Sequence, residues 1–131
     1  AGATLIVIDP ARTQEAQEAD LWLQPLPGRD TELALALLKC VIASDLHDED
    51  FIREHTTGFD ALRAHLDGLP LAALATASGI AESTIAQAAA LIGSARPTVF
   101  NAGNGLCQTG TPVIQIGRAI ACLIAATGNL G

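Results

Sequence analysis

Residues 5–13 read LIVIDPART, and this stretch decides the fold that we expect. Four branched aliphatic residues run directly into Asp9 and Pro10, a pattern typical of a strand buried on both faces of a parallel sheet. Pro10 has a backbone angle that suits the first turn of a helix. The stretch therefore predicts a strand over 4–9, a short helix over 13–19, and a carboxylate placed where the strand ends.

Two further strands and several further helices are predicted from the hydrophobic periodicity. The strands are expected over 21–23 and 97–102. One helix is expected to begin near Asp30, with Asp30 or Thr31 as its cap, and another near Asp48, with Asp48 as its cap. Further helices are expected over 59–66, 71–77, 82–93 and 113–127. Their inward faces are expected to carry Leu33, Leu37, Leu38, Val41, Phe51, Ile52, His55, Ile85, Ala88, Ala89 and Ile92. This order predicts an α/β fold, with a Rossmann-like partial parallel sheet of about three strands flanked by helices.

The 131 residues are enough for one domain, and we expect residues 1–131 to be a single-domain fragment. Three strands are fewer than a sheet usually has, so further strands are expected in sequence outside this chain. The chain begins without a methionine or a basic leader, which is typical of an excised or processed piece. Its localisation is left open between the cytoplasm and the periplasm.

The composition restricts the partners that the chain can have. A formal net charge of −7 argues against binding to nucleic acids or to anionic membrane surfaces. No apolar run is long enough to span a bilayer. Cys40, Cys107 and Cys122 are an odd number at wide spacing, so we expect small buried hydrophobic residues rather than disulfides or zinc ligands.

Acidic residues stand at the ends of the first two predicted strands. In a parallel sheet, ligands gather beyond the carboxyl ends of the strands. Asp9 can accept hydrogen bonds from a ribose diol or from the paired N–H groups of a guanine, or it can cap a helix that begins at Pro10. Asp30, which follows a turn at Gly28, has the same two interpretations. If the strands are neighbours, these two exits and the loop over 103–110 share one rim.

The loop over 103–110 reads GNGLCQTG and lies between a predicted strand and a predicted helix. Backbone amides in such a loop can hold a phosphate or the edge of a pterin. The motif has only a GxG without a third glycine, so it is a weak indication of dinucleotide binding, and a plain flexible loop is an equal alternative.

The histidines and one arginine are further candidate site residues. His47, His55 and His65 lie among acids without an HExxH pattern, which favours a solvated helix start over a metal site. Arg118 lies within an apolar helix and can pair either with a ligand phosphate or with another part of the protein. No catalytic nucleophile or metal ligand is predicted.

Five short motifs stand in a fixed order: IDPART at 8–13, EAD at 18–20, PGRD at 27–30, GNGLCQTG at 103–110 and TGNLG at 127–131. Together they resemble the large catalytic subunit of molybdopterin oxidoreductases of the dimethyl sulfoxide reductase family, which includes formate dehydrogenases and nitrate reductases. The resemblance implies a segment of the domain that binds a molybdopterin guanine dinucleotide carrying molybdenum or tungsten. One position departs from the pattern, because the family's arginine directly after DP is Ala11 here and Arg12 follows it.

The resemblance also implies roles for individual residues. Asp9 and Asp30 are expected to hold the guanosine end of the cofactor, and the loop residues are expected on the pterin side. The expected cofactor-binding residues are Asp9, Pro10, Arg12, Gly28, Asp30, Gly103, Gly105 and Gln108. In the family, the metal ligand and any iron–sulfur cluster lie N-terminal to this region, so the isolated chain is expected to be inactive in redox chemistry.

Three functions are compatible with the sequence. The first is a segment of a molybdenum or tungsten oxidoreductase, with the pterin cofactor, the remainder of the catalytic subunit and an electron-transfer subunit as partners. The second is a non-catalytic α/β interaction module of the same ancestry, which would associate with itself. The third is a free nucleotide-binding domain. The sequence does not name a substrate.

Overall fold

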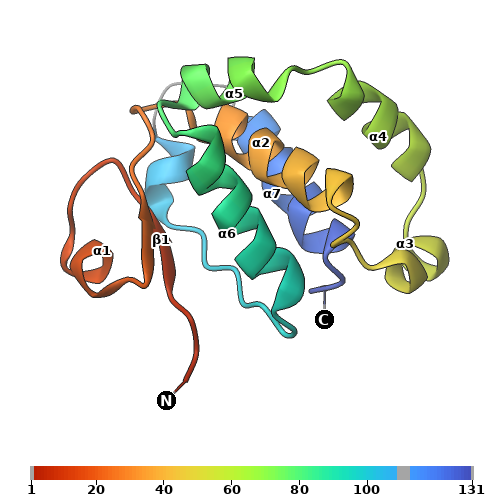
Figure 1. The fold of residues 1–131 in the computed structure, drawn as a ribbon, viewed down its shortest axis with the longest axis horizontal. Coiled ribbons are helices and arrows are strands. Elements are labelled where there is room, and N and C mark those ends of the chain that lie inside the picture. Colours follow the sequence, from red (N-terminus) through yellow and green to blue (C-terminus); the bar gives the residue numbers. More distant parts are fainter. Residues whose placement is uncertain (1, 109–112, 131) are drawn as a thin grey trace.

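The computed structural model describes residues 2–108 and 113–130, and within them the chain forms a mostly helical α/β structure. Figure 1 shows the arrangement of the elements. In chain order they are β1 (Ile6–Ile8), α1 (Gln14–Glu18), β2 (Leu21–Leu23), α2 (Asp30–Ala43), α3 (Glu49–His55), α4 (Phe59–Asp67), α5 (Leu71–Ser78), α6 (Glu82–Ser94), the 3-10 helix η1 (Asn104–Cys107) and α7 (Val113–Ala126). None of the helices in the described ranges is long and apolar enough to cross a membrane.

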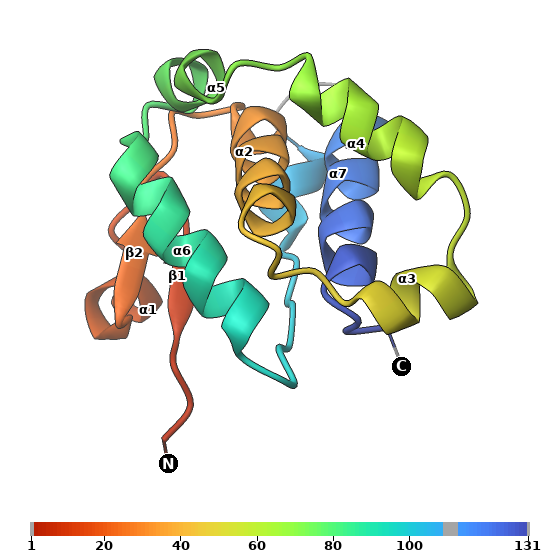
Figure 2. The same ribbon diagram turned by 45° about the vertical axis from the view of Figure 1, so that its right-hand side comes forward.

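The core is built around α2, which lies between α6 and α7 in Figure 2 and also packs against α5. The residues predicted to face inward from α2 and α6 are all buried, as are Ile52 of α3 and the fully enclosed Leu23 of β2. Small side chains such as Ala36, Ala88 and Ala89 let the helices approach closely. The predicted inward faces of these two helices are therefore confirmed. On α3, however, His55 is exposed, so its predicted place on the inner face is wrong.

The two strands form a parallel pair, in which Ile6 lies opposite Leu21 and Ile8 opposite Leu23. The prediction of a parallel sheet is confirmed, but the prediction of a strand buried on both faces is wrong. Leu5 is 45% exposed and Ile8 is 43% exposed. Ile6 packs against the core, but among the described residues β1 has only one neighbouring strand, so part of its surface stays uncovered.

The third strand predicted over 97–102 is absent from the described structure, and the prediction of about three strands is wrong. The Thr98 N–H donates to Oδ1 of Asn129 at 2.8 Å instead of to a neighbouring strand. Val99 is 89% exposed, and only Phe100 packs against the core. A run of β-favouring residues becomes a strand only where a partner backbone lies alongside it.

Candidate functional site

The exits of β1 and β2 lie at the same end of the sheet, because the two strands run parallel. Side chains and backbone join the two exits directly. The Gln24 side-chain amide donates to the carbonyl oxygen of Pro10 at 2.8 Å, and the Asp9 N–H donates to the carbonyl oxygen of Leu23 at 3.1 Å. The prediction that these two strand exits share one rim is confirmed.

Asp9 holds a turn at this rim and does not cap a helix. Its Oδ1 accepts a hydrogen bond from the Ala11 N–H at 2.7 Å, two residues further along the chain. Helix α1 begins only at Gln14, where the Thr13 hydroxyl accepts from the Ala16 N–H at 3.2 Å and is the cap. The helix-capping interpretation of Asp9 is therefore wrong. Its second carboxylate oxygen has no hydrogen-bond partner among the described residues, so it has acceptor capacity for a ligand.

Asp30 is the first residue of α2, and the cap position belongs to Arg29, whose side chain makes no capping hydrogen bond. Gly28 precedes it with a φ of +77°, a left-handed turn conformation that favours glycine. Capping by Asp30 or Thr31 is thus wrong. The Asp30 carboxylate lies in the first helical turn, where the helix dipole favours negative charge. The Thr31 hydroxyl oxygen beside it is buried without a partner in the described part of the chain.

The third predicted loop does not join this rim where the structure describes it. The segment over 104–107 forms η1, which packs against α7. In Figure 1, η1 overlaps the strands, but the turned view of Figure 2 separates the two. At Gly103 and Gly105, no atom of the described residues lies within 4 Å of the position of a new Cβ, and Gln108 is exposed. Residues 109 and 110 of the predicted loop lie outside the described residues.

The two candidate arginines are exposed, and neither forms an ion pair with a described residue. Arg12 lies in the segment between the Asp9 turn and α1, and Arg118 lies on α7. Both guanidinium groups are thus available to an anionic ligand or to another protein surface.

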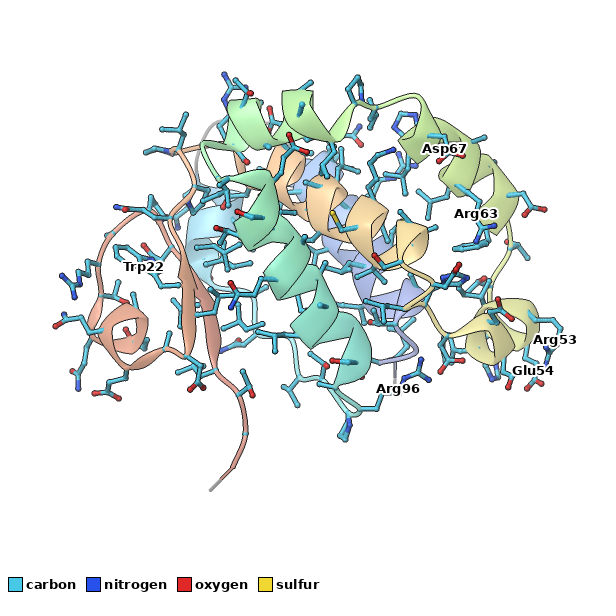
Figure 3. The ribbon with its side chains drawn as sticks, viewed as in Figure 1. Trp22, Arg53, Glu54, Arg63, Asp67 and Arg96 are labelled. Carbon is cyan, nitrogen blue, oxygen red and sulfur yellow. The ribbon has the colours of Figure 1, made fainter. Side chains whose placement is uncertain are left out.

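The prediction of a solvated histidine is wrong for His47 and holds for His55 and His65. The His47 side chain is only 3% exposed, and its ring lies 5.3 Å from the ring of Phe59. Arg63, labelled in Figure 3, approaches its Nε2 at 3.4 Å and also stacks over Phe59. His47 thus helps to pack α4 onto the rest of the structure. No group of three or more potential metal ligands occurs within the described residues.

Several proteins are similar to almost the whole chain. It is 35% identical to the probable oxidoreductase YoaE of Bacillus subtilis over 98% of this chain, and 34% identical to the F420-dependent formate dehydrogenase 1 subunit alpha of Methanococcus maripaludis over 99%. It is also 35% identical over 97% of its length to an assimilatory nitrate reductase of Haloferax mediterranei. The solved structure of acetylene hydratase from Pelobacter acetylenicus matches 98% of the chain with a TM-score of 0.93 at 29% identity.

The chain is homologous to part of the molybdopterin oxidoreductases of the dimethyl sulfoxide reductase family. The resemblance predicted from the five motifs is therefore confirmed. The chain spans 19% of YoaE and of the formate dehydrogenase, 17% of the nitrate reductase and 18% of the acetylene hydratase chain. No protein-family model matches the chain.

In this molybdopterin oxidoreductase segment, the described residues of the TGNLG motif connect the C-terminal end of α7 to distant parts of the chain. The Thr127 hydroxyl is buried and donates to the Leu123 carbonyl oxygen at 2.9 Å, while Asn129 accepts from the Thr98 N–H. Gly128 packs directly against the side chain of Asp48, whose backbone N–H donates to the Ala126 carbonyl oxygen at 2.8 Å. Sequence reasoning used this stretch as one of the five motifs but did not predict these contacts, because they join segments far apart in the chain.

Asp48 joins the start of α3 to the end of α7. It was predicted as the cap of α3, and this is confirmed, because its Oδ1 accepts from the Phe51 N–H at 2.9 Å. Its other oxygen pairs with Arg96, which lies near the end of α7 in Figure 3. The Phe51 hydrogen bond, with a further contribution from Arg96, holds the pKa of the Asp48 carboxyl below its ordinary value. The stabilisation is therefore present above the unfolded-state pKa and is lost as the pH falls through the folded-state pKa.

We expect the Asp48→Asn variant to lose less stability in acid than the wild type. Asparagine can still cap α3 but does not titrate. The difference between the urea midpoints of the two proteins should therefore shrink as the pH falls below about 4, the region in which aspartate titrates. Urea unfolding measured at a series of pH values, with Asp60→Asn on the exposed start of α4 as the control, would test this. A difference that stays constant down to about pH 2 would contradict the role of the Asp48 charge.

Proposed function

We propose that the chain helps to hold the guanosine end of a molybdopterin guanine dinucleotide in an oxidoreductase catalytic subunit. The observation that supports the proposal is the parallel pairing of β1 and β2, because it puts the exits that lead to Asp9 and toward Asp30 at the same end of the sheet. Asp9 and Asp30 follow neighbouring strands, and neither is used as a helix cap. One Asp9 oxygen holds the turn, but the other oxygen and the Asp30 carboxylate have no hydrogen-bond partner among the described residues. Acceptors placed beyond the carboxyl ends of parallel strands suit the ribose diol or the N–H edge of a guanine.

The residues around the two carboxylates fit such a nucleotide. The buried Thr31 hydroxyl without a described partner lies next to Asp30 and can bond to a bound group. Gly28 gives the turn its left-handed conformation, and Pro10 shapes the turn after Asp9. Arg12 is exposed beside that turn and can pair with a phosphate, in a region where Ala11 offers no charge.

Gly103, Gly105 and Gln108 are proposed for the pterin side of the same cofactor. No described atom lies within 4 Å of the position of a Cβ at either glycine, so a flat ligand can approach the amides closely. The cofactor supplies the redox chemistry when it is bound, and the residues of this chain bind and orient it. The remainder of the catalytic subunit and an electron-transfer subunit are the proposed partners. The charge of −7 makes local donors necessary for an anionic cofactor.

A second candidate function is an interaction module that pairs with a second copy of itself. The uncovered apolar side chains Leu5, Ile8 and Leu26 near the sheet favour it, because such surface is usually covered in the working protein. The remainder of a catalytic subunit would cover the same side chains. Sedimentation of the isolated chain separates the two candidates, since the module requires a stable dimer.

We expect Asp9→Asn and Asp30→Asn each to lower the guanine nucleotide content of the catalytic protein that carries this chain by about tenfold. Asparagine keeps an acceptor oxygen for the Ala11 N–H but lacks the charge that strengthens hydrogen bonds to guanine or ribose. The measurement is the GMP released by acid hydrolysis per mole of purified protein, together with its molybdenum and tungsten content.

The matched control is Asp60→Asn, an exposed aspartate in the first turn of α4, far from the strand exits in Figure 1. It should leave the GMP content unchanged. A wild-type protein that is well folded yet contains neither GMP nor metal would rule out the proposed function. Equal GMP content in all three variants and the wild type would rule out the roles of Asp9 and Asp30.

A further inference from the structure

Trp22 of β2 and Gln24, which follows the last residue of β2, bind the backbone of the turn that contains Asp9. The Trp22 indole N–H donates to the Asp9 carbonyl oxygen at 2.9 Å, and the Gln24 amide donates to the Pro10 carbonyl oxygen at 2.8 Å. Both side chains reach the same turn, although only Trp22 belongs to the strand. Leu23 between them points to the opposite face and is fully buried in the core.

This arrangement leaves little freedom to the turn. Four consecutive hydrogen-bonding groups are occupied: the Asp9 N–H by Leu23, the Asp9 and Pro10 carbonyls by Trp22 and Gln24, and the Ala11 N–H by the Asp9 carboxylate. Figure 3 shows Trp22 on the side of the strands where α1 lies. A carbonyl group in an exposed turn can bond to water at little cost, so stability alone does not require two side chains for this purpose.

We propose that Trp22 and Gln24 are positioning residues for base recognition, because they fix the direction in which Asp9 presents its carboxylate. The proposal rests on the proposed function, in which Asp9 reads the guanosine end of the cofactor. A carboxylate accepts the two N–H groups of a guanine only when its plane is aligned with the base. Fixing the backbone on both sides of Asp9 aligns it before the ligand arrives.

Loss of these two hydrogen bonds is therefore expected to change the selectivity for the base rather than to weaken the binding of every nucleotide. GDP and IDP differ only in the 2-amino group of the base, which guanine has and hypoxanthine lacks. An aligned Asp9 accepts from that group and favours GDP over IDP, by about tenfold for one charge-assisted hydrogen bond. When the turn is released, Asp9 keeps its charge but is no longer aligned with the base. The ratio of GDP to IDP affinity then falls toward one.

The experiment compares GDP and IDP binding to the chain by calorimetric titration. The variants are Trp22→Phe, which keeps an aromatic ring and removes the N–H, and Gln24→Met, which keeps the length and removes the donor. The matched control is Gln17→Met, because Gln17 also donates to a backbone carbonyl, that of Thr13, but outside the Asp9 turn. Thermal unfolding of every variant shows whether the fold is kept, and Gln24→Glu, which has no donor either, should behave like Gln24→Met.

We expect the ratio of GDP to IDP affinity to fall about tenfold in Trp22→Phe and in Gln24→Met, and to stay unchanged in Gln17→Met. A purely structural role would weaken both nucleotides equally and leave the ratio as in the wild type, which would overturn the inference. If Asp9→Asn abolishes the preference for GDP while Trp22→Phe and Gln24→Met retain it, the inference fails and the proposed function stands. If the wild type shows no preference for GDP and Asp9→Asn changes neither affinity, both the inference and the proposed role of Asp9 fail.

Discussion

Replacing Ile85 by alanine is expected to lower the free energy of unfolding by about 2–5 kcal/mol, the largest effect predicted for this chain. Ile85 is fully buried on α6, where that helix packs against the central α2. Removing three carbon atoms there loses their transfer free energy and leaves a cavity that the packed helices cannot close completely. Urea unfolding followed by circular dichroism would measure the change.

The matched control is Ile114→Ala, which makes the same chemical change on helix α7. Ile114 is 75% exposed, so its removal should change the free energy of unfolding by no more than about 0.5 kcal/mol. Alanine also has the higher helix propensity, which offsets part of any loss. Equal effects of the two substitutions would show that α6 does not pack on α2 in the way described.

Replacing Gly128 by alanine is expected to cost about 2 kcal/mol or more. Gly128 has a φ of +68°, a conformation that costs other residues about 1–2 kcal/mol. In addition, the new Cβ would lie 2.7 Å from Oδ2 of Asp48. That carboxylate cannot move aside without giving up the cap of α3 or the pairing with Arg96. Stability would be measured from the urea midpoint.

Gly58→Ala separates the two contributions at Gly128. Gly58 has a similar φ of +80°, but no atom lies within 4 Å of the position of a new Cβ. Its substitution should therefore show the backbone cost alone, and the excess cost at Gly128 should reflect the contact with Asp48. If Gly58→Ala is as destabilising as Gly128→Ala, the close contact between Gly128 and Asp48 makes no measurable contribution to the free energy of unfolding.

The helices could be predicted closely because the interactions that define them are local. The inward positions of α2 and α6 recur at helical spacing, and Asp48 caps α3 as its place before Glu49 and Asp50 indicates. The third strand could not be predicted in this way. Residues 97–102 favour extended backbone, but whether a partner strand lies beside them depends on segments distant in sequence or outside the chain.

For the candidate site, the structure confirms the parallel pairing of the two strands, while the roles of the individual residues stay predictions. The order of the motifs located Asp9 and Asp30 at strand exits, and the parallel pairing brought those exits together. Helix capping could not be excluded from the sequence, since an aspartate before Pro10 or beside Thr31 satisfies the usual cap pattern. Trp22 and Gln24 were missed, although their alternation with Leu21 and Leu23 places them on the face away from the core.

The sequence by itself determined the helices, the parallel character of β1 and β2, and the homology to molybdopterin oxidoreductases, because periodicity, caps and motif order are written along the chain. The tertiary structure decided three other matters: that residues 97–102 do not pair with a strand, that His47 is buried against Phe59, and that the Asp9 carboxylate holds a turn and leaves one oxygen without a described partner. Each of these depends on groups that fold in from distant positions, and burial or hydrogen bonding between such groups cannot be read from neighbours in sequence.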